Sequence, residues 1–225
     1  MSNALRLVIF DVDGTLVDSQ ADILSAVASA FNQAGLVVPP RDEILSIVGL
    51  SLDVAVSRLA PEVGAQTHRD MVQGYKDAYI ALRAQSCAAQ SSPLYPGARD
   101  ILEDVQKVPN ILLGVATGKS RRGLDKLIEA HGLDHMFVTQ QVADHHPSKP
   151  HPSMIQQAMA DTGVDAQDTV MIGDTSFDMQ MARAAGVHGI GVSWGYHPVS
   201  ALVDASHMLD AFAELPGALS MIWSD

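Results

Sequence analysis

The sequence predicts an α/β protein, in which a doubly wound parallel sheet carries an inserted bundle of α-helices as a cap. Two observations lead to this fold class. Short runs of apolar residues alternate with segments of helical periodicity over most of the chain, as in parallel sheets whose strands are joined by helices. One stretch, residues 18–90, has helical periodicity alone. We therefore expect a Rossmann-like catalytic core of residues 1–17 and 91–225 and an α-helical cap of residues 18–90.

The expected core strands are short and apolar. The first reaches Phe10 as a continuous apolar run, which is typical of a strand buried on both faces. Four further strands, and a last short one, are expected at 111–117, 137–139, 169–172, 189–192 and 208–209.

Helical spacing and glycine stops define the helices. Gly132, Gly163 and Gly186 each follow a helical segment, where glycine commonly ends a helix. The core helices are expected at 97–105, 120–131, 152–162 and 177–185, with a broken helix at 211–223. The cap helices are expected at 19–34, 41–48, 52–59 and 67–84, with 85–92 as a linker.

Composition excludes several classes of protein. Apolar residues make up 47% of the 225 residues and the net charge is -12, which suits a globular protein with a large core and no nucleic-acid partner. No segment has the about 18 consecutive apolar residues of a membrane span. Cys87 is the single cysteine and no signal peptide is evident, so we expect a cytoplasmic location, away from the membrane. A monomer or a homodimer is expected.

Reactive side chains follow three of the predicted strands. Asp11 and Asp13 come directly after the first strand, and Thr117 ends the second. Asp174 follows the strand at 169–172, with Asp178 four residues further on. Because the carboxyl ends of parallel strands share one edge of the sheet, where ligands bind, we expect these side chains to meet.

These residue types together favour phosphoryl transfer. Carboxylates are ligands that Mg²⁺ prefers, with substrate phosphate oxygens completing its shell. Lys149 lies between prolines that stiffen its loop, and an ammonium and a hydroxyl suit a phosphoryl group. One spare carboxylate can act as a nucleophile that forms an aspartyl phosphate, and a second can act as acid and then base. The expected substrate is a small-molecule phosphate.

Four segments resemble the four motifs of the haloacid dehalogenase-like hydrolase superfamily. They are residues 11–15, Thr117, Lys149 and residues 173–178, in the order of the motifs. A helical insert directly after the first motif resembles the C1-type cap of that superfamily. Residues 18–19, 148–152 and 173–175 are most similar to phosphoglycolate-phosphatase-like members.

The resemblance implies a role for each acid. Asp11 would attack phosphorus, and Asp13 would protonate the leaving alcohol and then activate water. Mg²⁺ would contact Asp11, the backbone carbonyl of Asp13 and Asp174, with Asp178 as a ligand or a support. Dehalogenases of the superfamily lack an acid at the position of Asp13 and need no metal, so its presence favours a phosphatase.

The resemblance also implies substrate contacts. Thr117, Gly118 and Lys149 would hold the phosphate oxygens, and the cap would contact the leaving group through Gly49 and Arg58. A phosphomonoester such as 2-phosphoglycolate is the expected substrate. An inorganic pyrophosphatase or a sugar-phosphate phosphatase of the same superfamily is the alternative.

Other classes of function stay open. Residues 191–195 match the G-x-S-x-G pattern of serine esterases, with Ser193 as nucleophile and Asp204 and His207 as partners. Residues 114–120 nearly spell a P-loop, but one residue between the glycines is missing. A non-catalytic binding module on the same fold is a further alternative. Each acid at a strand end also has an ordinary structural interpretation, as a helix cap or a turn residue.

Overall fold

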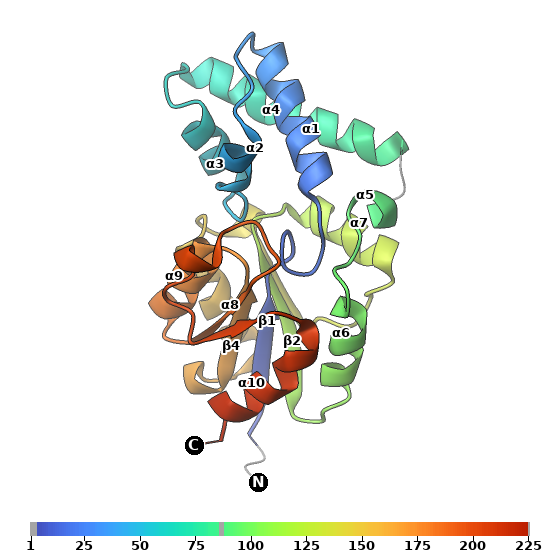
Figure 1. Cartoon of the computed structure of the whole chain (residues 1–225), viewed down its shortest axis with the longest axis vertical. Coiled ribbons are helices and arrows are strands. Elements are labelled where there is room, and N and C mark those ends of the chain that lie inside the picture. The colour runs from blue at the N-terminus through green and yellow to red at the C-terminus, as the bar shows by residue number, and fades with distance from the viewer. Residues whose placement is uncertain (1–3, 86–87, 225) are drawn as a thin grey trace.

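A parallel sheet forms the core of the structure, which is a computed structural model and describes residues 4–85 and 88–224. The sheet has six strands in the order β3-β2-β1-β4-β5-β6, and all neighbouring pairs are parallel (Figure 1). In chain order the strands are β1 (Arg6–Phe10), β2 (Ile111–Thr117), β3 (Thr139–Val142), β4 (Thr169–Gly173), β5 (His188–Val192) and β6 (His207–Leu209). The predicted fold class is confirmed.

Helices cover both faces of this sheet, and β1 shows why. Alternate side chains of a strand point to opposite faces, so Val8 and Phe10 pack in one apolar cluster and Leu7 and Ile9 in another. The first cluster includes residues of α6 (Ala98–Gln106), α7 (Arg121–His131) and α10 (Leu215–Ile222). The second includes residues of α8 (Ser153–Thr162) and α9 (Ser176–Ala185). The strand is thus buried on both faces, as its sequence predicts.

A group of helices lies beyond the carboxyl edge of the sheet (Figure 1). It consists of α1 (Gln20–Gln33), α2 (Arg41–Leu45), α3 (Leu52–Leu59) and α4 (Ala65–Gln85). Their apolar faces form a separate core that includes Ile23, Phe31, Ile44, Val56 and Met71. We call these helices and their connections the cap.

Two neighbouring segments connect the cap with the sheet. The backbone N–H of Asp18 donates to the carbonyl of Pro93 at 2.9 Å, and Val17 forms a bridge with Leu94. The predicted linker 85–92 contains the short helix α5 (Ala88–Ser91), and residues 86–87 lie outside the described residues. The division at residues 17 and 90 stays a prediction.

One expected strand is misplaced. The apolar residues 137–139 predict it, but β3 is the polar segment Thr139–Val142. The reason is that Asp161 satisfies its polar side chains, accepting from Thr139 Oγ1 at 2.8 Å and from Gln141 Nε2 at 2.7 Å. Phe137 instead packs into the apolar core.

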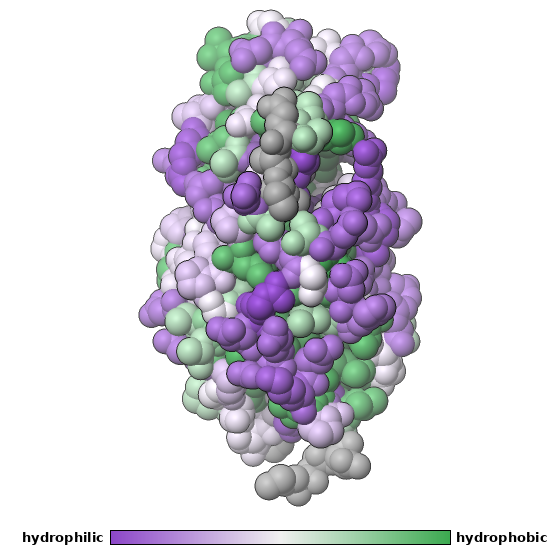
Figure 2. Space-filling view, turned by 90° about the vertical axis from the view of Figure 1, so that its right-hand side faces the viewer, coloured by the Kyte–Doolittle hydropathy of each residue, from purple (hydrophilic) through white to green (hydrophobic). Residues whose placement is uncertain are grey.

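The helix predicted at 41–48 is shorter in the structure. It ends at Leu45 and is followed by turns. The remaining short elements are 3-10 helices at Ala143–His145, Ala166–Asp168, Val199–Ala201 and Phe212–Glu214. On the face shown in Figure 2, hydrophilic side chains predominate and hydrophobic ones are scattered. None of the described helices combines the length and the apolar character needed to cross a membrane.

Candidate active site

Three adjacent central strands deliver the reactive groups. β1 lies between β2 and β4, and the residues at or just beyond their ends are Asp11, Thr117 and Asp174. All three are at most 1% exposed. The structure therefore brings together the strand-end residues that the sequence predicts at one edge.

A buried ion-pair cluster forms next to them. Lys149 Nζ lies 2.8 Å from Asp11 Oδ1 and 2.6 Å from Asp178 Oδ1. One oxygen each of Asp11, Asp174 and Asp178 lies within 4.8 Å of the others. One ammonium therefore pairs with two of three neighbouring carboxylates. Burial raises the pKa of Asp11 to about 7 although Lys149 opposes the shift, and burial and the neighbouring carboxylates raise the pKa of Asp174 well above its usual range.

The pKa of Lys149 is raised as well. Burial alone would lower it, but Asp11 and Asp178 favour the charged ammonium and hold its pKa above the ordinary value. If all three carboxylates are ionised, the ammonium offsets only one of their charges, and two negative charges remain. A bound divalent cation would balance them.

The trio of Asp11, Asp174 and Asp178 fits Mg²⁺. Both carboxylate oxygens of Asp11 are buried. Its Oδ1 faces the Lys149 ammonium at 2.8 Å, whereas Oδ2 has no hydrogen-bond donor among the described residues and is available to a ligand. Asp174 accepts one hydrogen bond on each oxygen, from Thr15 Oγ1 at 2.9 Å and from the Tyr196 N–H at 2.8 Å. Oxygen ligands of this kind, with substrate oxygens added, are those that Mg²⁺ prefers.

The carboxylate of Asp178 accepts more hydrogen bonds than those of Asp11 and Asp174. Its Oδ2 accepts from the N–H of Thr175 at 3.0 Å and from Thr175 Oγ1 at 2.6 Å, which forms a capping box at the start of α9. Its Oδ1 accepts from Lys149 at 2.6 Å. Asp178 thus accepts three hydrogen bonds, one of them from an ammonium, whereas Asp174 accepts two from uncharged donors. This difference favours a supporting role for Asp178 over direct ligation.

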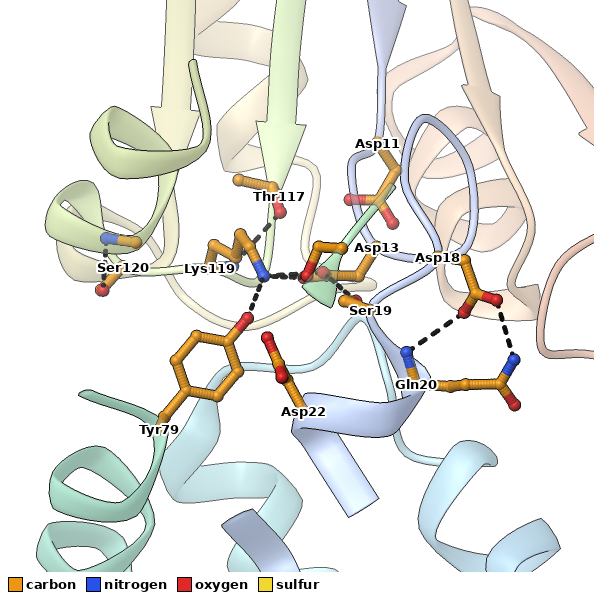
Figure 3. A network of polar contacts seen from close by, with 12 residues as sticks. Asp11, Asp13, Asp18, Ser19, Gln20, Asp22, Tyr79, Thr117, Lys119 and Ser120 are labelled. Carbon is orange, nitrogen blue, oxygen red and sulfur yellow. Dashed lines mark hydrogen bonds and ion pairs between the residues drawn. The ribbon is translucent and has the colours of Figure 1, made fainter. Parts of the chain in front are cut away.

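Asp13 points toward Lys119 (Figure 3). Lys119 Nζ lies 2.6 Å and 2.7 Å from its two oxygens, and the hydroxyl of Ser19 also donates to Asp13. Burial alone would lower the pKa of Lys119, but the charge of Asp13 raises it above the ordinary value. The metal contact expected for Asp13 is through its backbone carbonyl and stays a prediction.

Lys119 was not predicted as a site residue. In the sequence it stands only in a near P-loop, although it follows the strand-end residue Thr117 by two positions. Its ammonium also lies 3.3 Å from the hydroxyl of Tyr79, a residue of the cap helix α4 (Figure 3). Lys119 thus joins the acid–base candidate Asp13 to the cap.

The cap meets the sheet edge most closely at a glycine pair. A Cβ atom added to Gly118 would lie 2.5 Å from the carbonyl oxygen of Gly49 and 2.6 Å from that of Leu50. Beside this contact, the N–H of Ser51 donates to Ser148 Oγ at 2.9 Å. Gly49, predicted to contact substrate, therefore lies next to the predicted phosphate loop.

Arg58 lies apart from these groups. Its guanidinium is 5.3 Å from the ring centroid of Phe177, and it is not among the residues that line the cavity described below. A contact of Arg58 with substrate stays a prediction.

The segment after β5 connects the acid cluster with the cap. Besides donating to Asp174, Tyr196 accepts a hydrogen bond from the Ser19 N–H at 2.8 Å through its hydroxyl. His197 lies between its partners, with Nδ1 3.2 Å from the Ser176 nitrogen and Nε2 3.0 Å from the Ser46 carbonyl. Burial lowers the pKa of His197.

The alternative serine nucleophile in the same region is not assembled. A nucleophile elbow leads from a strand into a helix, whereas β5 is followed by a loop and a 3-10 helix, Val199–Ala201. Asp204 pairs with Arg183 at 3.0 Å. Within residues 4–85 and 88–224, no hydrogen bond joins Ser193 to His207.

A cavity of about 1040 Å³ opens between the cap and the sheet edge. Asp11, Asp13, Thr117, Gly118 and Lys119 contribute its wall on the side of the sheet. The rest comes largely from the cap. The candidate nucleophile and the candidate acid–base therefore face a cavity that can hold a substrate.

Comparison with known proteins agrees with this geometry. Residues 8–192 match the haloacid dehalogenase-like hydrolase family. A Dickeya dadantii protein named "Probable phosphatase IndB" is 37% identical over 217 residues, covering 94% of this chain and 92% of the relative. A phosphoglycolate phosphatase of Pasteurella multocida is 29% identical, over 85% of this chain and 87% of the relative.

A solved structure from Haemophilus somnus, described as a predicted phosphoglycolate phosphatase, has the same fold. It superposes with a TM-score of 0.83 at 24% identity, covering 97% of this chain and 99% of that one. The chain belongs to the haloacid dehalogenase-like hydrolase family. Within the family it is an enzyme of the phosphoglycolate-phosphatase-like subgroup.

Proposed function

We propose that this enzyme hydrolyses a phosphomonoester with Asp11 as its nucleophile. The observation that carries the proposal is the state of Asp11, which is buried, pairs through Oδ1 with Lys149 at 2.8 Å, and has an Oδ2 without a hydrogen-bond donor among the described residues. A carboxylate with a free oxygen can attack phosphorus and form an aspartyl phosphate. The names of the relatives, as phosphatases, support this proposal.

Mg²⁺, held by Asp11, the backbone carbonyl of Asp13 and Asp174, would offset the negative charge of the carboxylates and of the phosphate. The chain supplies the remaining contacts. Lys149 and the hydroxyl of Thr117 would bind the phosphoryl oxygens, and the N–H of Gly118 would add a donor. These groups would hold the phosphorus in line with the Asp11 oxygen.

Asp13 would move the protons. It would give a proton to the oxygen of the leaving alcohol while Asp11 bonds to phosphorus. It would then take a proton from water, which attacks phosphorus and releases phosphate from Asp11. Lys119 and Ser19 hold the Asp13 carboxylate from two sides, so they would keep it aimed at the reacting oxygens.

The names of the relatives make 2-phosphoglycolate the first candidate substrate, with pyrophosphate and sugar phosphates as alternatives. The test is release of inorganic phosphate from a panel of these compounds, with and without Mg²⁺. We expect Mg²⁺-dependent turnover that Asp11→Asn abolishes. Turnover that survives Asp11→Asn, or no turnover on any phosphomonoester, would refute the proposal.

A further inference from the structure

The cavity between the cap and the sheet edge is far larger than a small acid needs. Its volume is about 1040 Å³. Pockets of about 300–1,000 Å³ enclose drug-sized ligands, whereas 2-phosphoglycolate has only about nine non-hydrogen atoms. Thr117 and Gly118 line this space on the side of the sheet, and most of the other lining residues belong to the cap, so much of the space would remain for the leaving group once the phosphate is bound.

The cap side of the cavity is mainly apolar. Its aliphatic wall consists of Ile23, Val27, Ile47, Val48, Leu50, Leu52, Ala55, Val56, Leu59 and Ile80. The rings of Tyr75 and Tyr79 add a flat surface, with centroids 5.9 Å apart and an angle of 22° between their planes. Such a wall gains free energy by covering apolar surface of a ligand.

The inner cations of this cavity already have partners. Lys119 pairs with Asp13 at 2.6 Å. Arg83 pairs with Asp22 at 3.1 Å and donates to the Tyr79 hydroxyl at 2.8 Å. A second negative charge on the leaving group, such as the carboxylate of glycolate, would have to compete for them. The other cations that line the cavity lie at exposed positions, namely Lys76, Arg122 and Lys126.

We propose that the substrate is the phosphomonoester of a bulky, uncharged alcohol with an apolar or aromatic ring body, and that this body fills the cap cavity. The proposal rests on the proposed function, since it assumes that the phosphoryl group binds at Asp11. It differs from that function in what it says of the leaving group, which would be recognised by area and shape and not by charge.

The test compares phosphate esters whose leaving alcohols have similar acidity but different size. Ethyl, benzyl and 2-naphthylmethyl phosphate form such a series, and 2-phosphoglycolate is added for its charge. We expect kcat/KM to rise at least about tenfold from ethyl to 2-naphthylmethyl phosphate, mainly through KM, and to be lower for 2-phosphoglycolate than for benzyl phosphate.

A cavity-filling variant locates the effect. Ile80 lines the cavity and is 43% exposed, so Ile80→Trp adds bulk there without entering the cap core. It should lower kcat/KM for the naphthylmethyl ester much more than for ethyl phosphate, and so remove most of the preference for the larger ester. Val37→Trp is the matched control, because Val37 is 91% exposed and does not line the cavity.

Three results would overturn the inference in distinguishable ways. Equal or falling kcat/KM along the series, or the highest value for 2-phosphoglycolate, would refute the bulky leaving group and leave the phosphatase function standing. No phosphate release from any of the esters would refute the proposed function together with the inference. A naphthylmethyl preference that Val37→Trp removes as completely as Ile80→Trp would place recognition outside the cavity and also refute it.

Discussion

Replacing Lys149 by methionine should destabilise the metal-free enzyme more than any change at its surface. The side chain of Lys149 is fully buried and pairs with two carboxylates, Asp11 at 2.8 Å and Asp178 at 2.6 Å. Removing one partner of a buried ion pair costs about 3–5 kcal/mol because it leaves a buried charge uncompensated. Since two pairs share this ammonium, we expect Lys149→Met to lose about 4–5 kcal/mol of the free energy of unfolding at pH 7.5.

The loss should depend on pH and on Mg²⁺. The folded pKa of Asp11 is raised to about 7, above its unfolded value, and loss of Lys149 would raise it further. An acid that is protonated in the folded state makes stability fall as pH rises through the window between the two pKa values, at about 1.4 kcal/mol per pH unit. The deficit should therefore be smaller at pH 5.5 than at pH 7.5, and Mg²⁺ should restore part of it.

Urea unfolding followed by circular dichroism, in EDTA and then in Mg²⁺, measures these differences. The control is Lys107→Met, which removes an exposed pair with Asp104 and should produce no resolvable change. A Lys149→Met variant that is as stable as the control, or whose deficit is the same at both pH values and with Mg²⁺, would refute the charge balance described for the site.

Three further predictions concern the cap and the phosphate site. Gly118→Ala should lower kcat/KM more than tenfold, because the Cβ of the alanine would lie 2.5 Å from the carbonyl oxygen of Gly49. Steady-state kinetics measures this, and an unchanged kcat/KM would contradict the close approach of Gly118 to Gly49. Thr117→Val should raise KM about tenfold, because one hydrogen bond to the phosphate is lost. The melting temperature should change little. An unchanged KM would show that Thr117 does not bind the phosphate. Burial lowers the pKa of His197 in the folded state, so the free energy of unfolding of the wild type should fall as the pH drops below about 6.5. His197→Gln should make this fall smaller, as measured by urea unfolding at pH 7.5 and 5.5. An equal fall in both proteins would contradict a buried neutral imidazole.

Apolar runs made most of the sheet predictable. β2 occupies the predicted range, Ile111–Thr117, because a strand buried on both faces must be apolar throughout. β3 was misplaced because a polar edge strand can be as well satisfied as an apolar one when a single acid, Asp161, accepts its hydrogen bonds. Local patterns carry no information about such a distant partner.

The same limit applies to the candidate site. Asp11, Thr117 and Asp174 were predictable because each stands at the end of a strand, and topology brings strand ends together. Tyr196 was not predictable as a neighbour of the site, since it reaches Ser19 from 177 positions away in the chain. The separate roles of Asp11 and Asp13 were implied by resemblance alone and stay a prediction. The structure shows that the two acids have different partners, Lys149 and Lys119.

The cavity was also beyond prediction from the sequence. Helical periodicity identifies which face of each cap helix is apolar, but not how far the helices stand from the sheet edge. The cap contributes both a tightly packed core and an apolar wall that faces the reacting groups. Only the packing angles of the helices, which depend on side chains from several elements, decide how much of the apolar surface remains uncovered.

The central claim, that Asp11 carries the phosphoryl group, is tested most directly by trapping the intermediate. Enzyme mixed with a ³²P-labelled phosphomonoester and Mg²⁺ is quenched in acid within milliseconds, and the labelled peptide is identified by mass spectrometry. The account predicts acid-stable label on Asp11 and none in Asp11→Asn. In Asp13→Asn, with a labelled aryl phosphate whose leaving group needs no proton, it predicts a larger amount of label, because water is no longer activated. Turnover without label on Asp11 in either the wild type or Asp13→Asn would contradict it.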